Sequence, residues 1–195
     1  MTNAPTENPQ LARFADRAAR FTAVLQGAAG RWDAVTPCDG WTVRDVVDHV
    51  VETQRDFLTR HDLPLPARTP DQDPAATWQT HRAAVEALLA GEGVAARRYD
   101  GWFGPTTIGD TMVDFYGWDL LVHGWDVARA TGQELVWPDE LVADLEATAD
   151  GWGDSLYGEG ICRPPVELTG DATPQDRLLA RLGRDPRWTA PEPVR

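Results

Sequence analysis

Residues 110–131 set the strongest limit on how this chain can fold, because three of their ionisable side chains share one stripe of a mostly apolar helical pattern. With Asp119 at the origin of a helical wheel that advances about 100° per residue, His123 falls at about +40° and Asp126 at about −20°. A helix that is apolar nearly all round is normally buried, and unpartnered buried charges cost several kcal/mol each. The segment is therefore expected to lie in the interior, with a partner that compensates this stripe.

A divalent cation is the partner that compensates the stripe most directly. The i, i+4 spacing lets the side chains of Asp119 and His123 converge on one point. A third ligand has to come from another helix, and His49 is the best candidate because it borders the apolar stripe of residues 42–61. The alternatives are a buried Asp–His ion pair or a stripe that lines a water-filled groove, with His49 left half-exposed at the surface.

The other histidines and the cysteines are weaker candidates for metal chemistry. Two cysteines cannot build a Cys-rich structural zinc site, and a disulfide between Cys38 and Cys162 is not expected in a reducing compartment. Cys38 precedes a helix N-terminus, a position that lowers the pKa of a thiol, but its turn-rich surroundings favour a packing role. His61 near a helix end and His81 among polar neighbours are expected to be solvated.

The rest of the chain also has the apolar spacing of helices, separated by turn-forming residues. Thr42 with Asp45 three residues later resembles a capping box. The pattern predicts an all-α fold in one domain, residues 1–195, with a core at about 8–155, an extension at about 156–195 and at most a short extended piece at 99–108. The expected helices are 9–26, 42–61, 74–90, 110–131, 138–152 and 173–182.

Composition excludes several classes of partner and chemistry. The formal net charge of −13 argues against nucleic acid or an anionic membrane surface as partner. No apolar run approaches the roughly 20 residues that span a bilayer, and residues 1–10 lack the features of a secretory signal, so a cytoplasmic location is expected. The chain has no lysine, which removes Schiff-base chemistry. Its arginines near the end, including Arg184, lie among Asp176 and Asp185 and are expected to form a mixed surface.

Three stretches resemble one known family. Trp32-Asp33 together with residues 36–49 (TPCDGWTVRDVVDH) resembles the N-terminal signature of the DinB/YfiT-like superfamily, in the branch of mycothiol-dependent maleylpyruvate isomerase and its actinobacterial relatives. Residues 119–132 (DLLVHGWDVARATG) resemble the second signature, with Asp119 where the isomerase has glutamate. Residues 174–186 (PQDRLLARLGRDP) look like the tail of an uncharacterised group in that branch. Together the matches cover nearly the whole chain.

This resemblance implies a four-helix bundle with a short C-terminal helical extension and one divalent ion held by three protein ligands, here His49, Asp119 and His123. The ion is most often zinc in such proteins, with nickel or iron(II) as alternatives. The resemblance also implies a thiol-dependent transferase or isomerase for some members. The larger C-terminal domain of the isomerase is not expected in this chain, so the resemblance does not imply the isomerase's substrate.

Two histidines and one carboxylate leave a coordination position open, the pattern of catalytic zinc. The leading hypothesis is a transferase or isomerase in which a low-molecular-weight thiol such as mycothiol attacks a small electrophilic molecule, in a monomer or homodimer. Asp126 would orient a ligating imidazole or the bound nucleophile, with pairing to Arg129 as the alternative. Three aromatic residues could line a substrate pocket beside the ion, or could pack in the core instead. The other hypotheses are a metal-dependent hydrolase, an iron(II) oxygenase and a non-catalytic metal- or ligand-binding module. The three aromatic candidates are Trp41, Tyr116 and Trp125.

Overall fold

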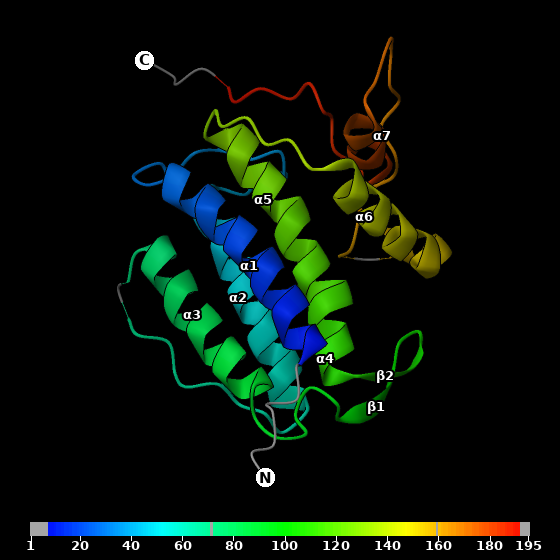
Figure 1. Ribbon diagram of the computed structural model, residues 1–195. Helices are drawn as coiled ribbons and strands as arrows, with labels where there is room; N and C mark the ends of the chain where they lie inside the picture. The colour runs from blue at the N-terminus through cyan, green and yellow to red at the C-terminus, as the bar shows by residue number, and fades with distance from the viewer. Residues whose placement is uncertain (1–7, 71, 159, 192–195) are drawn as a thin grey trace.

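The computed structural model describes residues 8–70, 72–158 and 160–191, and the all-α fold expected from the sequence is confirmed (Figure 1). Helices make up most of the described chain, and its strands are limited to one short hairpin. In chain order the elements are α1 (Pro9–Gly27), α2 (Val43–Arg60), α3 (Pro74–Leu89), β1 (Arg98–Gly101), β2 (Gly104–Thr107), α4 (Ile108–Thr111), the π-helix η1 (Met112–Gly117), α5 (Trp118–Ala130), α6 (Asp139–Trp152), the 3-10 helix η2 (Gly153–Tyr157) and α7 (Pro174–Arg181).

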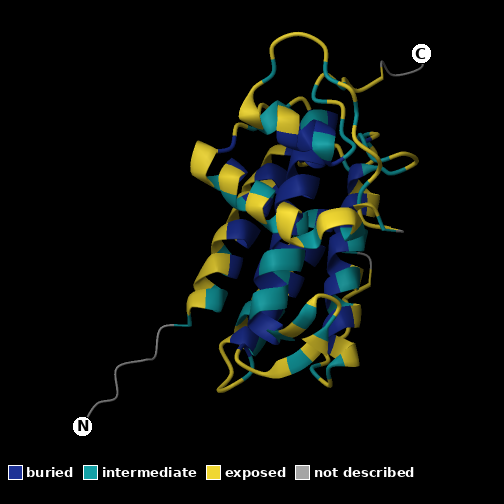
Figure 2. Cartoon of the chain, turned by 90° about the vertical axis from the view of Figure 1, so that its right-hand side faces the viewer, coloured by how far each residue is buried: buried dark blue, intermediate teal, exposed yellow. Residues whose placement is uncertain are grey.

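Four helices, α1, α2, α3 and α5, lie side by side and form the bundle (Figure 1). Their inner faces are buried and their outer faces are exposed (Figure 2). Each of the four helices contributes fully buried apolar side chains to the core. Burial of each such side chain stabilises the folded state by about 1.5–3 kcal/mol. They include Phe14 and Phe21 from α1, Val46 and Val50 from α2, Trp78 from α3, and Leu120 from α5.

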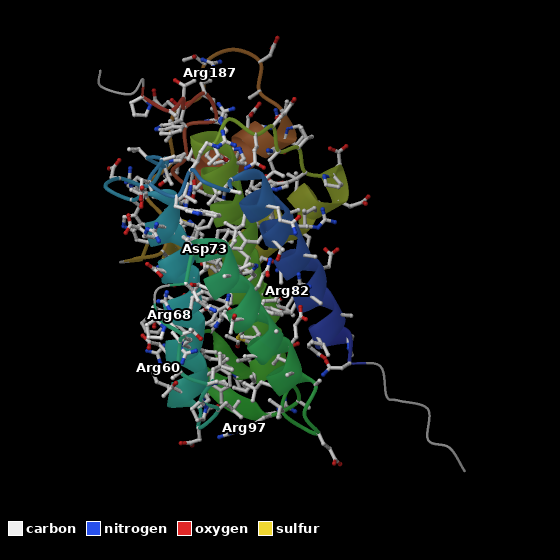
Figure 3. The ribbon with its side chains drawn as sticks, turned by 90° about the vertical axis from the view of Figure 1, so that its left-hand side faces the viewer. Arg60, Arg68, Asp73, Arg82, Arg97 and Arg187 are labelled. Atoms are coloured by element: carbon white, nitrogen blue, oxygen red, sulfur yellow. The ribbon has the colours of Figure 1, made fainter. Side chains whose placement is uncertain are left out.

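The start of α2 is fixed by the capping box that the sequence predicts. The backbone N–H of Thr42 donates to Asp45 Oδ2 at 2.8 Å, and the N–H of Asp45 donates to Thr42 Oγ1 at 3.3 Å. Arg68, labelled beside α2 in Figure 3, pairs with Asp48 and Glu52 at 2.6 and 2.5 Å, which holds the following link against the helix. Both features secure the helix that carries His49.

α5 is covered on two sides, which explains why its sequence is apolar nearly all round. One side faces the bundle core, and the other packs against α6 and α7 in a second apolar cluster. α6 and α7 lie together beside the upper part of α5 (Figure 1). Within the described part of the chain, none of the helices combines the length and apolarity needed to cross a membrane. The second cluster includes Trp118, Leu121 and Trp125 from α5, Leu145 from α6 and Leu178 from α7.

Residues 110–131 are not one continuous α-helix as predicted, because η1 interrupts them. A π-helix bonds i to i+5 and has more residues per turn than an α-helix, so a wheel of about 100° per residue does not hold across it. The buried Arg17 of α1 donates to the carbonyl of Val113 at 2.7 Å within this segment. Tyr116, in the same segment, packs against Phe57 with ring centroids 5.1 Å apart.

The extended piece expected near residues 99–108 is the antiparallel β1–β2 hairpin, with Arg98 opposite Thr107 and Gly101 opposite Gly104. Trp102 and Phe103 form its two-residue turn, and Gly104 has a φ of 104°, which an L side chain rarely adopts. The hairpin immediately precedes α4 and lies at the end of the bundle opposite to α7 (Figure 1).

The prediction that His81 is solvated was wrong, because the side chain lies in the bundle and is only 4% exposed. Its Nε2 lies 3.0 Å from Gln54 Oε1, while Nδ1 is buried without a hydrogen-bond partner. The neutral ring with its proton on Nε2 satisfies this geometry, whereas a second proton on Nδ1 would be a buried charge without an acceptor. Burial, helped by the charges of Arg55 and Arg68, lowers the pKa of His81 to about 3.

We therefore expect protein stability to fall as the pH drops below 6.5, the ordinary pKa of histidine. In that range the unfolded chain binds a proton at His81 and the folded chain does not, so acid favours unfolding, by about 2 kcal/mol at pH 5. Urea unfolding of the wild type and of His81→Gln at pH 7.5 and pH 5 measures this. The variant should lose less stability between the two pH values. An equal loss in both proteins would contradict the assignment.

Candidate metal centre

The structure brings His49, Asp119 and His123 together where α2 passes α5. His49 Nε2 lies 3.7 Å from Asp119 Oδ2, and His123 Nε2 lies 3.4 Å from Asp119 Oδ1. The two imidazole rings are 5.1 Å apart and meet edge to face. One ligand atom from each of the three residues lies within 4.8 Å of the other two. Side chains 70 residues apart in the chain thus converge on one point.

The spacing of these atoms fits a bound divalent ion. Two ligands bonded to zinc at about 2.1 Å in tetrahedral geometry lie about 3.4 Å from each other. The separations of 3.4 and 3.7 Å run to different oxygens of the Asp119 carboxylate, and one ligand atom from each residue lies within 4.8 Å of the other two, so the side chains have to move closer together to form such a site. Imidazole nitrogen and carboxylate oxygen are donors that suit zinc, nickel and iron(II).

Asp126 holds the far side of the His123 ring. Its side chain is fully buried, and its Oδ2 lies 2.9 Å from His123 Nδ1. Because Nδ1 is engaged there, Nε2 is the atom left to face Asp119, an arrangement typical of histidines that bind metals. The alternative that Asp126 pairs with Arg129 is not what the structure has, because Arg129 donates to two backbone carbonyls of the C-terminal segment.

Arg184 is the cationic partner of Asp126, and the prediction that it belongs to a mixed surface was wrong. Its side chain is only 12% exposed, and its Nη2 donates to Asp126 Oδ2 at 3.1 Å. Burial alone would raise the pKa of Asp126, but the charge of Arg184 and the hydrogen bond from His123 outweigh it and hold that pKa well below its usual range. Asp126 is therefore ionised at neutral pH.

The protonation of His123 is linked to occupancy of the site. Burial alone would lower the pKa of His123, but the carboxylates of Asp119 and Asp126 outweigh this effect and raise it to about 10. The ion-free ring thus carries a proton near pH 7, which compensates the acidic stripe. An ion bound at Nε2 would take the place of that proton, so metal uptake at this group would release a proton and be favoured as the pH rises.

A cavity of about 380 Å³ opens beside the three side chains. Trp41 lies on its wall, 4.8 Å from the His49 ring and stacked 5.9 Å from the His123 ring. Tyr116 and Trp125, predicted to line a pocket, are instead in the packing on either side of α5, because η1 shifts the first and the second faces the α6–α7 cluster. The opposite wall comes from the end of α6 and from the C-terminal segment, with Trp152, Cys162, Arg163 and Arg184.

Sequence reasoning missed the thiols and the arginine beside this cavity. Cys38, expected to pack in a rigid turn, lines the cavity, and its Sγ lies 3.2 Å from Asp126 Oδ2 and 3.9 Å from His123 Nδ1. Cys162 lies 3.9 Å from Arg184 Nη1, and burial raises the pKa of its thiol to about 11. Both cysteines are free. Only the position of Cys38 just before α2 could have placed it near the site.

Comparison with known proteins agrees with the resemblance in the sequence. A family model described as the mycothiol maleylpyruvate isomerase N-terminal domain matches residues 11–128. Two uncharacterized proteins of Mycobacterium tuberculosis, from strains CDC 1551 / Oshkosh and ATCC 25618 / H37Rv, are each 30% identical to this chain over 173 residues, which are 86% of this chain and 93% of the relative. No solved structure matches the chain with significance. The matched region contains His49, Asp119 and His123 but ends before Arg184.

Removal of either imidazole should abolish metal loading. We expect wild-type protein dialysed against zinc to retain about one ion per chain, and His123→Ala or His49→Ala to retain almost none, because a catalytic zinc site needs three protein ligands. Mass spectrometry of the dialysed proteins measures the stoichiometry. His61→Ala is the matched control, since that ring packs on Tyr99 at 4.2 Å and lies outside the group. Full zinc content in folded His123→Ala would refute the ligand assignment.

Proposed function

The chain belongs to the family of mycothiol maleylpyruvate isomerase N-terminal domains, and from that premise we propose that it is a divalent-metal enzyme that uses a low-molecular-weight thiol, such as mycothiol, on a small electrophilic molecule. The observation that carries this proposal is the convergence of His49, Asp119 and His123 at the wall of an open cavity. Three protein ligands leave a position for a further ligand, which a structural zinc site does not.

In this proposal the three side chains hold the ion, with zinc favoured by two imidazoles and one carboxylate. A divalent ion bound there stabilises the deprotonated form of a thiol or water close to neutral pH. Asp126 acts through its contact with His123 Nδ1, which keeps the ring in one tautomer and orientation. Being fully buried, Asp126 is a positioning residue rather than one that touches substrate.

The cavity supports a small molecule as the second reactant. Its volume of about 380 Å³ lies within the range of small-ligand pockets. Trp41, Trp118 and Trp152 give it flat apolar walls that reduce access of water to the reacting atoms. In a transfer reaction the thiol sulfur forms a bond to an electrophilic carbon, and the thiol proton leaves with the product or the displaced group. In an isomerisation the same carbon–sulfur bond forms and then breaks, and the thiol is returned.

An activity assay on zinc-loaded protein tests the proposal. We expect consumption of electrophiles, with 1-chloro-2,4-dinitrobenzene and maleate esters as probes, to require mycothiol and to fall to the background rate in His123→Ala, because that variant lacks an imidazole ligand. Nickel- and iron-loaded protein are assayed in parallel, and His61→Ala serves as the control that keeps all three ligands.

Each alternative function predicts a different outcome of the same assay. Turnover that does not depend on any thiol would replace the proposal with a metal-dependent hydrolase. Oxygen consumption by the iron-loaded protein would replace it with an oxygenase. Metal binding without turnover of any probe, with a small molecule still bound in the cavity, would leave a metal- and ligand-binding module.

A further inference from the structure

Arg184 enters the candidate metal centre from a part of the chain that lies outside the matched family region. It follows α7 and reaches across to Asp126, 58 residues earlier, on α5. Its Nη2 donates to Asp126 Oδ2 at 3.1 Å and its Nε to Oδ1 at 3.4 Å, so the guanidinium spans both carboxylate oxygens. A fork of this kind fixes the plane of a carboxylate as well as neutralising it.

The conformation of Arg184 is itself set by the end of α7. Its backbone N–H donates to the carbonyl of Leu179 at 2.9 Å, and its Nη1 donates to the carbonyl of Leu182 at 2.9 Å. Gly183 before it has a φ of 75°, and a Cβ there would lie 2.6 Å from the Cβ of Arg163 and 2.8 Å from its carbonyl oxygen. The backbone turn and the side-chain contacts therefore aim the guanidinium at Asp126.

Asp126 has few other ways to keep its orientation. It is fully buried, and the same Oδ2 that faces Arg184 also faces His123 Nδ1 at 2.9 Å and Cys38 Sγ at 3.2 Å. Without the guanidinium, the carboxylate would be a buried charge free to rotate toward other donors. The ring of His123 would then lose the contact that directs its Nε2 toward Asp119.

From this chain of contacts we infer that Arg184 is a positioning residue for the metal centre, through which the C-terminal segment sets the affinity for the ion. The inference rests on the proposed metal site. It means that the metal centre extends beyond the region that defines the family, and that docking of α7 and binding of the ion stabilise each other.

The test compares Arg184→Met and Arg184→Lys with Arg181→Met. Arg181 lies on α7 and pairs with Asp150 at 2.7 Å, so its removal perturbs the docking of the same helix without touching Asp126. Zinc dissociation constants are measured by competition with a chromophoric chelator, and the visible absorption of cobalt-loaded protein reports the geometry of the ligands. Thermal melting of the ion-free proteins measures folding separately.

We expect Arg184→Met to weaken zinc binding by about 10–100-fold, the usual cost of losing a group that supports a metal ligand, and to alter the cobalt spectrum. Arg184→Lys should recover part of the affinity, because it restores the charge without the fork. Arg181→Met should bind zinc like the wild type even where its melting temperature is lower. Wild-type affinity in folded Arg184→Met, or an equal loss in both Met variants, would overturn the role of Arg184. A wild type that binds no metal would overturn the metal centre itself.

An independent observation concerns a second cavity of about 740 Å³ between the β1–β2 hairpin and the end of α6. Aromatic side chains dominate its walls, and the ring of Phe103 stacks on that of Trp152 at 6.2 Å with an angle of 11°. Phe115, Trp152 and Ile161 line both this cavity and the one beside the metal centre. The two cavities are therefore adjacent and share one wall.

The second cavity offers apolar surface rather than charge. Trp102 is 88% exposed and Phe103 52% exposed, although the protein is strongly acidic overall. The two carboxylates in the lining already have partners: Asp110 accepts from Gln10 and Thr107, and Asp114 pairs with Arg13. Contiguous exposed aromatic surface is often used for binding, which makes this cavity a candidate site.

We propose that this aromatic groove, formed by Trp102, Phe103, Phe115 and Trp152, binds the uncharged, flat, apolar part of the molecule whose reactive carbon lies at the metal centre. The shared wall allows one ligand to occupy both cavities, and the engaged carboxylates favour a ligand part without charge. The identity of the molecule in the groove rests on the proposed function. Binding in the groove can nevertheless be measured in protein without metal.

Fluorescence titration with the uncharged dye N-phenyl-1-naphthylamine tests the groove in ion-free protein. The double variant Trp102→Ala/Phe103→Ala should weaken dye binding by about tenfold or more, because two aromatic walls are lost. Val136→Ala, which removes another exposed apolar side chain, should leave it unchanged. In zinc-loaded protein, the same double variant should raise the KM for 1-chloro-2,4-dinitrobenzene but not for iodoacetamide, which has no ring.

Equal dye affinity in the wild type and the double variant, or loss of dye binding in Val136→Ala instead, would overturn the groove. A wild-type dimer that becomes a monomer in the double variant would show that the aromatic side chains pack against a second copy, and would overturn it as well. Equal changes of KM for both electrophiles would overturn the shared occupant. If the double variant weakens dye binding as expected but the wild type turns over no electrophile, the groove stands and the proposed function fails.

Discussion

The structure depends on compensation of charge along α5, a helix buried on two sides that nevertheless carries Asp119, His123 and Asp126. Asp119 faces His49 of α2 and Asp126 faces Arg184 after α7, while His123 lies between these two carboxylates of its own helix. At the fully buried Asp126, the low accessibility that makes the charge costly also makes its partner specific, because water cannot take the place of Arg184. The bundle and its C-terminal helices are therefore held around α5 by polar contacts as well as by apolar packing.

Local sequence rules predicted much of the fold because they depend on neighbours in the chain. The apolar spacing placed the bundle helices, and the capping box at Thr42 placed the start of α2. The same rules put Asp119 and His123 on one face, since they are separated by a single α-helical turn. His49 could be selected only because it bordered an apolar stripe, and the resemblance to a family with three metal ligands strengthened that choice.

The features that sequence reasoning missed are those fixed by distant contacts. The π-helix η1 forms where Arg17 of α1 reaches the carbonyl of Val113, 96 residues later, and no local pattern marks it. His81 has polar neighbours in sequence but meets Gln54 of α2 across the bundle. Arg184 stands among aspartates in the sequence, yet the φ of Gly183 turns it inward. In each case tertiary contacts decided the environment of a polar side chain.

The candidate metal ligands and the far wall of the cavity come from different parts of the molecule. His49, Asp119 and His123 lie on α2 and α5, inside the stretch that the family model matches, where helix packing holds them. The far wall of that cavity is formed by Trp152 at the end of α6 and by residues between Cys162 and Arg184, while the hairpin turn lines the adjacent second cavity. Loops and helix ends tolerate change better than packed helices do. If the proposed function holds, the two packed helices would supply the chemistry, the loops and helix ends would select the molecule that reaches it, and Arg184 would connect the two parts through Asp126.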